Sequence, residues 1–165
     1  MTTVALRPPR AGTHINPVRA TPAPLLDESV GGVPSDRDFI AMRTAYRASG
    51  GIACGDDLAR LLEDHQRGDF ISLAKLIVAG EVFGFDRHHT FWVPMFQFEL
   101  HDLSVKPASR QVLAELGSAF DGWSLATWFV RANCWLNGQR PVDLLDSNRP
   151  SVLEAARVDR FIAVG

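Results

Sequence analysis

The chain has 165 residues, 18.2 kDa and a formal net charge of −2. This length allows one domain, or two small ones that share a core, and the hydrophobic content of 46% is enough to form that core. The net charge excludes a general electrostatic attraction to nucleic acid or acidic membranes. No apolar run approaches the roughly 18 residues that cross a bilayer, so we expect a cytoplasmic protein without a membrane partner. Two isolated cysteines, Cys54 and Cys134, fit a reducing compartment and indicate buried thiols.

Residues 1–34 hold six of the ten prolines and no aromatic residue. Such a segment cannot bury enough apolar surface to offset its ordering entropy, so the sequence predicts a disordered arm. Its arginines, Arg7, Arg10 and Arg19, could contact an acidic partner, but a solvated tail is the favoured interpretation.

Residues 35–104 are predicted to begin with three helices. Ser35 and Asp38 form a capping-box pattern ahead of the first helix. Asp56 is a candidate cap for the second, which breaks at residues 65–68, and Asp69 is a candidate cap for the third. Two short helices joined by a tight turn have the outline of a helix-turn-helix.

The hydrophobic period then changes from helical to two. Val82, Phe83 and Phe85 suit a strand, and a second strand is expected over 91–98. Because proline cannot donate to a β-ladder, Pro94 indicates an edge strand or a bulge. The pair is predicted to be a β-hairpin in the position of a wing, which makes residues 35–104 a winged-helix-like unit.

Residues 105–165 are predicted to form a small helical domain. The expected fold class is therefore mainly α with one β-hairpin, a winged-helix-like unit being followed by this domain. The helix starts and the turn within it are marked by Pro107, Asp121, Asn137-Gly138, Pro141 and Pro150.

No pattern in the chain indicates catalysis, a cofactor or a metal. His88, His89 and His101 lack the number and spacing of zinc ligands, and Cys134 has no neighbouring base. Glycine-rich phosphate loops and nucleophile elbows are absent from the sequence. We expect a protein that is not an enzyme.

DNA binding is the obvious function for a helix-turn-helix, but the charge opposes it. Residues 55–90 carry four basic and seven acidic side chains, a local charge of −3. That sign is wrong for a phosphate contact, so we expect weak, salt-sensitive DNA binding at best. The candidate DNA contacts are Ser72, Lys75 and Arg87.

Three of the four tryptophans lie between residues 123 and 135. Helical spacing favours Trp128 and Phe129 as core residues. Trp123 and Trp135, near a helix start and a turn, are better candidates for exposed interface anchors, where tryptophan is enriched. The segment that follows, with Leu136 and Pro141, is expected to shape the same surface.

Two segments resemble the Xre/MbcA/ParS-like antitoxin family. The first, over about 105–165, combines Trp128-Phe129, Asn133, Leu136-Asn137-Gly138 and Pro141-Val142-Asp143-Leu144-Leu145 with a closing helix. It resembles the family's toxin-binding domain. The second, Trp92 to Phe98, is similar to the strand that precedes this domain in members with a degenerate helix-turn-helix.

The resemblance implies a helical C-terminal domain, a homodimer, and neutralisation of a partner toxin, commonly a RES-domain enzyme that degrades NAD. It assigns the toxin contact to residues 152–165. The expected contact residues there are Arg157, Asp159, Arg160, Phe161 and Gly165.

We therefore expect an antitoxin-like protein that occludes a partner toxin with its C-terminal helix. The alternative is a winged helix-turn-helix transcriptional regulator that binds DNA as a dimer. A third interpretation is a scaffold whose aromatic residues only fill its core.

Overall fold

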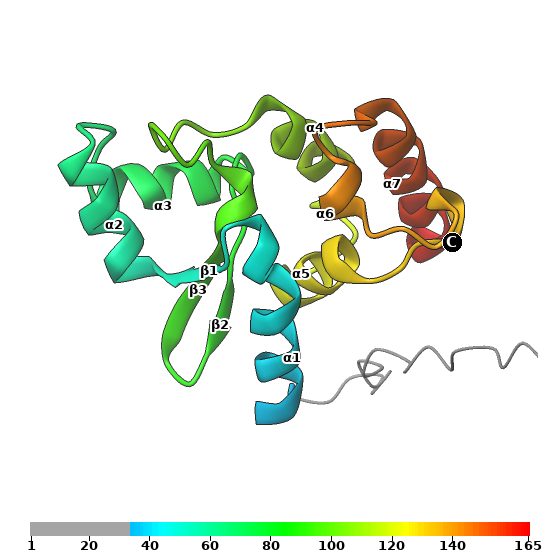
Figure 1. Cartoon of the computed structure of the whole chain (residues 1–165), viewed down its shortest axis with the longest axis horizontal. Helices are drawn as coiled ribbons and strands as arrows, with labels where there is room; N and C mark the ends of the chain where they lie inside the picture. The colour runs from blue at the N-terminus through cyan, green and yellow to red at the C-terminus, as the bar shows by residue number, and fades with distance from the viewer. Residues whose placement is uncertain (1–33) are drawn as a thin grey trace, which may run out of the picture.

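The computed structural model describes residues 34–165, so the predicted N-terminal arm lies almost entirely outside the described residues. This part of the chain is mainly helical with a small antiparallel sheet, which confirms the expectation of a mainly α fold with one β-hairpin (Figure 1). Within it, no helix is both long and apolar enough to span a bilayer. In chain order the elements are α1 (Asp36–Tyr46), η1 (Arg47–Ser49), β1 (Ile52–Cys54), α2 (Gly55–Asp64), α3 (Phe70–Val78), β2 (Phe85–Arg87), β3 (Thr90–Pro94), η2 (Met95–Gln97), α4 (Pro107–Leu116), α5 (Gly122–Val130), η3 (Cys134–Leu136), α6 (Pro141–Leu144) and α7 (Arg149–Val164), where η denotes a 3-10 helix.

Most of the predicted helix starts are confirmed. Ser35 and Asp38 form both hydrogen bonds of a capping box at α1. The Asp69 and Asp121 side chains accept from backbone N–H groups in the first turns of α3 and α5. The prediction for α2 is wrong, because that helix begins at Gly55 and Asp56 lies inside its first turn. There its charge complements the helix dipole rather than capping a free N–H group.

The sheet has the order β1-β3-β2 with both pairs antiparallel. The prediction that the second strand of the hairpin is an edge strand is therefore wrong, since β3 pairs on both sides. Pro94 is tolerated because it is the last residue of β3, opposite Ile52, where no interior ladder bond is lost. The sequence pattern missed β1, which has only three residues and gains its partner from a segment 40 residues later.

The hairpin between β2 and β3 closes through a two-residue loop. Arg87 pairs with Thr90, and the two residues between them, His88 and His89, have φ values of 48° and 62°. Positive φ at both central positions is the geometry of a type I′ turn, which normally uses Asn-Gly. Histidine has a Cβ atom that opposes this conformation.

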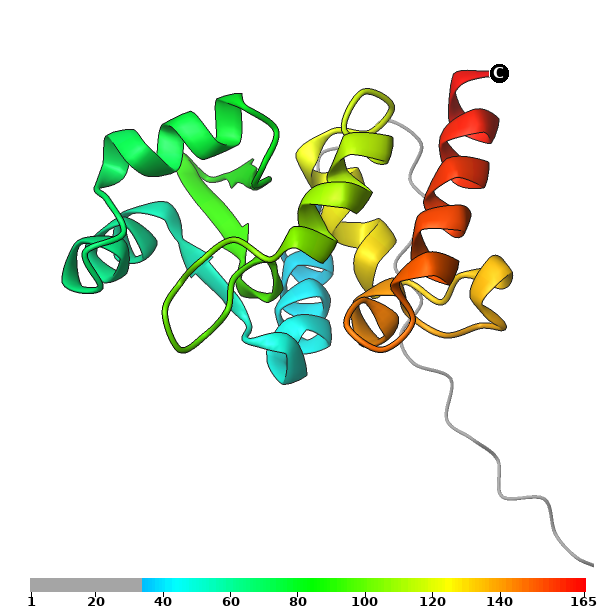
Figure 2. The same ribbon diagram turned by 90° about the horizontal axis from the view of Figure 1, so that it is seen from above.

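Residues 34–165 form two hydrophobic cores, and the larger one spans the boundary that the sequence indicates at residues 104–105. The smaller core lies between α2, α3 and one face of the sheet. The larger core joins α1 and the other sheet face to helices α4 to α7. Tyr46 of α1 is fully buried in it and donates a hydrogen bond to the Ala126 carbonyl at 2.8 Å. Figures 1 and 2 both place α2 and α3 at one end of the molecule and α7 at the other, with α1 between them.

We predict that His89→Gly stabilises the protein, because glycine adopts the required positive φ without the Cβ clash. The free energy of unfolding is expected to rise by about 0.5–1 kcal/mol, measured by urea denaturation. His101→Gly is the control, since this exposed residue lies in a loop and does not have a positive φ. Equal gains in both variants would contradict the explanation from turn strain.

Candidate functional site

Helix α7 changes its environment halfway along its 16 residues. In its first half, Val152, Ala155 and Ala156 are buried against the larger core. In its last turn, Phe161, Ile162 and Val164 are between 63% and 77% exposed. We call these three residues the α7 tip. Figure 2 shows this end of α7 projecting beyond the rest of the molecule. Packing therefore fixes the first half of α7, while its apolar end lies in solvent.

The carboxylate of Asp159 gathers three side-chain donors just before the tip. Its Oδ2 accepts from Trp128 Nε1 at 2.8 Å and from Asn133 Nδ2 at 2.7 Å. Its Oδ1 accepts from Trp135 Nε1 at 3.0 Å. Bonds to a charged acceptor are stronger than neutral ones, so one residue of α7 fixes three residues that precede it by 24 to 31 positions.

This network orients an exposed tryptophan. The indole ring of Trp135 is 53% exposed although its N–H is bonded to Asp159. Its backbone N–H donates to Asn133 Oδ1 at 2.9 Å, which holds the start of η3. Ile162 lies three residues after Asp159, on the same side of the helix. The exposed indole and Ile162, one residue of the α7 tip, therefore lie on the same side of α7.

Two arginines of α7 are tied to the neighbouring helix α4. Arg157 Nε lies 3.0 Å from Glu115 Oε1, and Arg160 Nη1 lies 2.8 Å from Glu115 Oε2. The hydrogen bond that Arg157 donates to Glu115 is the main cause of a raised pKa for Arg157, which also contacts Glu154. Both guanidinium groups remain about half exposed, so each retains donors for a further acceptor beside the tip.

The expected partner-binding residues divide into two groups. Trp135, Arg157, Asp159, Arg160 and Phe161 gather around the second half of α7, which ends at Val164 and is followed by Gly165. Leu136 and Pro141 are buried instead, and the expectation that they shape the surface is wrong. Both sit in short helical turns whose apolar side faces the larger core, and periodicity over so few residues cannot distinguish inside from outside.

The predictions for the aromatic residues are also only partly confirmed. Trp128 and Phe129 are core residues, as predicted. Trp123 is half-buried rather than an exposed anchor, with its ring centroid 5.1 Å from that of Phe85 in an edge-to-face contact. The expectation of a packed Cys134 is wrong, since its thiol is exposed at the start of η3, and Cys54 is half-buried.

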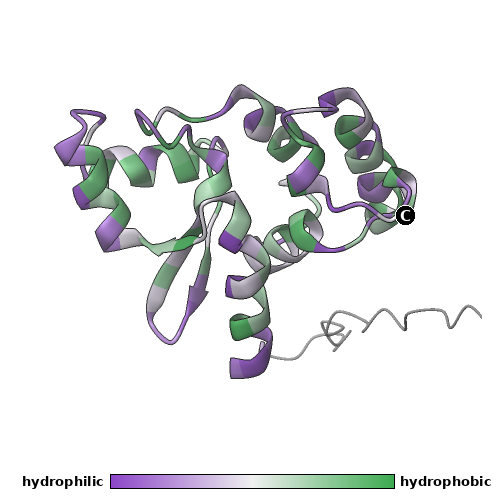
Figure 3. Cartoon of the chain, viewed as in Figure 1, coloured by the Kyte–Doolittle hydropathy of each residue, from purple (hydrophilic) through white to green (hydrophobic). Residues whose placement is uncertain are grey.

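The candidate DNA-contact residues provide few available donors for a DNA phosphate. Arg87 is buried, where it forms an ion pair with Asp36 and donates to the Pro34 carbonyl at 2.7 Å. The Ser72 hydroxyl is bonded to Asp69 at 3.0 Å. Lys75 is exposed, but the α3 surface around it carries Ile71 and Val78, the latter 90% exposed. Figure 3 accordingly colours most of α3 as hydrophobic.

The histidines considered for a metal do not gather. His88 Nε2 lies 3.2 Å from Asp36 Oδ1, while His101 faces Asp102 in the loop before α4. Across residues 34–165, no three His, Cys, Asp or Glu side chains form a group that could hold a metal ion.

We predict that Asp159→Asn destabilises the protein by about 2 kcal/mol. The amide retains one acceptor oxygen and turns an NH₂ group toward N–H donors, so buried donors lose their partner. The measurement is urea denaturation together with acrylamide quenching of tryptophan fluorescence, which should increase as Trp135 loosens. Glu154→Gln is the control on the same helix, because its ion pair at 3.5 Å is exposed and should matter by less than about 0.5 kcal/mol. A matching loss in both variants would show that Asp159 has no special role.

We also predict an acid-sensitive contact at Asp36. The hydrogen bond from His88, followed by that from Arg87, lowers the pKa of Asp36 below 3.8. A lowered pKa means that this contribution is present above about pH 4 and is lost as the pH falls through the folded-state value. Asp36→Asn should lower Tm at pH 7 and flatten its fall between pH 5 and pH 2. Asp86→Asn, at an exposed position on β2, should leave the Tm–pH curve unchanged.

Comparison with protein families, curated proteins and solved structures finds no match to this chain. The geometry of residues 34–165 is therefore the basis for a functional inference. Its most prominent feature is the α7 tip, an apolar helix end. Beside it lies the exposed Trp135, which is held by its hydrogen bond to the Asp159 carboxylate.

Proposed function

We propose that this protein is an antitoxin-like protein that binds and occludes a partner toxin through the end of α7. The observation that carries the proposal is the exposure of Phe161, Ile162 and Val164 on a helix whose first half is locked in the core. The resemblance of residues 105–165 to toxin-binding domains supports a RES-type enzyme that degrades NAD as the partner. A homodimer belongs to the same proposal.

The energetics of the α7 tip suit a protein interface. Burying a large apolar side chain contributes on the order of 1.5–3 kcal/mol, so three such residues form a substantial anchor. The helix is already ordered, which reduces the entropy lost on binding. Trp135 adds a rigid aromatic residue of the type enriched at the centres of interfaces.

Occlusion follows from the shape of this surface. A projecting helix end can enter a concave site on the partner and exclude substrate without any chemical step. Arg157 and Arg160 lie one turn or less before the tip, and their remaining donors suit carboxylates or carbonyls at the rim of such a site. Their ion pairs with Glu115 hold the two guanidinium groups in a defined position.

The alternative function is a DNA-binding regulator of the winged helix-turn-helix type. The element order α1-β1-α2-α3-β2-β3 and the sheet order β1-β3-β2 support it, since they are the order expected of a winged helix. The exposed Val78 and Ile71 of α3, the buried Arg87 and the local charge of −3 oppose it. A gel shift with the protein's own promoter at about 150 mM salt distinguishes the two, because tight binding there would favour the regulator.

We predict that Phe161→Asp combined with Ile162→Asp abolishes toxin binding without unfolding the protein. Both side chains are exposed, so the circular dichroism spectrum and Tm should stay close to those of the wild type. Calorimetry with a RES-type toxin should show at least about 30-fold weaker binding, because a hot spot contributes 2 kcal/mol or more.

Val78→Asp is the matched control, since it places the same charge at an exposed apolar position on α3. It should change toxin affinity by less than about threefold. Equal loss from both variants, or retained NAD protection by the α7 variant in cells that express the toxin, would overturn the proposed function.

A further inference from the structure

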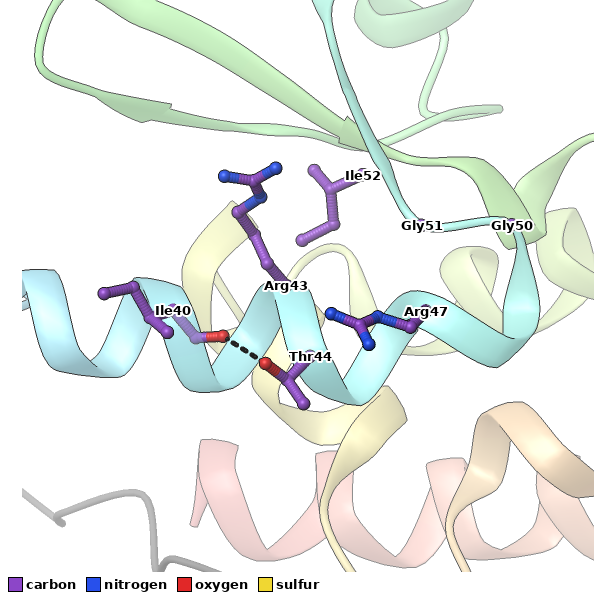
Figure 4. Close-up of a pocket in the computed structure, with 7 residues that line it drawn as sticks. All are labelled: Ile40, Arg43, Thr44, Arg47, Gly50, Gly51 and Ile52. Atoms are coloured by element: carbon purple, nitrogen blue, oxygen red, sulfur yellow. Dashed lines mark hydrogen bonds between the residues drawn. The ribbon is translucent and has the colours of Figure 1, made fainter.

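A second candidate surface lies between α1 and β1, on different elements from the α7 tip. An open groove of about 580 Å³ is lined by Arg43, Thr44 and Arg47 on α1 and its extension, and by Gly50, Gly51 and Ile52. Figure 4 shows how these residues lie. The lining residues include two arginines and no carboxylate. The groove is therefore positive in a chain of net charge −2.

The two arginines differ from most others in the described part of the chain. Seven arginines there form ion pairs with carboxylates, namely Arg60, Arg67, Arg87, Arg110, Arg140, Arg157 and Arg160. Arg43 and Arg47 are exposed and have no ion pair within residues 34–165. Arg43 contacts only an aromatic face, with its guanidinium carbon 5.9 Å from the centroid of Phe39. Two guanidinium groups one helical turn apart are thus available to an anionic ligand.

Aliphatic side chains flank this pair of charges. Ile40 and Leu100 are 63% and 62% exposed. Leu100 lies beside the groove, against Gly50: a Cβ atom at Gly50 would lie 3.3 Å from Leu100 Cδ2. The φ of Gly50, 98°, also requires glycine at this turn. The surface therefore combines two cations with two exposed aliphatic residues.

We propose that the Arg43–Arg47 groove binds an acidic peptide segment of a partner protein. Carboxylates at alternate residues of an extended segment lie on one face about 7 Å apart, close to the spacing of side chains one helical turn apart. Each carboxylate accepts from one guanidinium group, and a neighbouring leucine or isoleucine packs on Ile40 and Leu100. The aliphatic flanks favour a peptide over nucleic acid, because a phosphodiester backbone gains nothing from them.

The test is a ¹H–¹⁵N NMR titration of the full chain with a peptide in which aspartate alternates with leucine. We expect shifts confined to residues 40–52 and 100, and a Kd on the order of 0.1–1 mM, as two exposed ion pairs allow. The same peptide with asparagine in place of aspartate should not bind. Arg43→Gln combined with Arg47→Gln should weaken the peptide at least fivefold, and Leu100→Asn at least twofold.

Arg37→Gln is the matched control, because Arg37 is exposed on the same helix but does not line the groove. It should change the peptide Kd by less than twofold. Equal weakening by this variant, or the absence of shifts at residues 40–52, would overturn the proposal. Tighter binding of a 12-base-pair DNA duplex than of the peptide at about 150 mM salt would overturn it as well. Because the titration contains no toxin, its outcome is separate from that of the proposed function.

Discussion

The contact on which this structure depends is the packing around Gln97, where the sheet meets the helical half. Its fully buried amide accepts from the Phe83 N–H at 2.8 Å and donates to the carbonyls of Phe83 and Pro94. A buried amide is stable only when its groups are satisfied, so these bonds fix the segment before β2 against the end of β3. Phe83, Phe96 and Phe129 then pack together, with ring centroids 4.5–6.2 Å apart. The position of α5, and through it of α6 and α7, follows from this cluster.

The exposed end of α7 is a consequence of that arrangement. The small buried residues Ala155 and Ala156 bring α7 close to α4, whereas Phe161 beyond them is exposed. Between them, Asp159 links the helix to the body of the protein through Trp128, Asn133 and Trp135, and Arg160 links it through Glu115. The Asp159 carboxylate therefore lies between the packed first half of α7, which contributes to stability, and the exposed apolar residues of the proposed binding surface.

Electrostatics determine which surfaces are available. The chain has similar numbers of acidic and basic residues, and most arginines of the described part are paired with carboxylates. Arg87 of the helix-turn-helix outline is paired with Asp36, whereas Arg43 of α1 and Arg47 of η1 have no ion pair within residues 34–165. The proposed contacts with partners thus use exposed apolar residues and unpaired guanidinium groups, which the fold places on different elements.

Strong local signals in the sequence identified several elements. The capping box at Ser35, the cap at Asp69 and the buried pair Trp128-Phe129 were predictable, because caps and helical periodicity depend on neighbours within a few residues. Only the tertiary structure placed β1 beside β3 and gave Asp159 its three donors, because these partners lie 24 or more residues away in the chain. It also buried Leu136 and Pro141 and exposed Cys134. These residues occupy turns that are too short for hydrophobic periodicity to show which side chains face the core. Residue type and local spacing specify a helix and its ends, but which of its side chains faces a neighbour depends on contacts between distant segments.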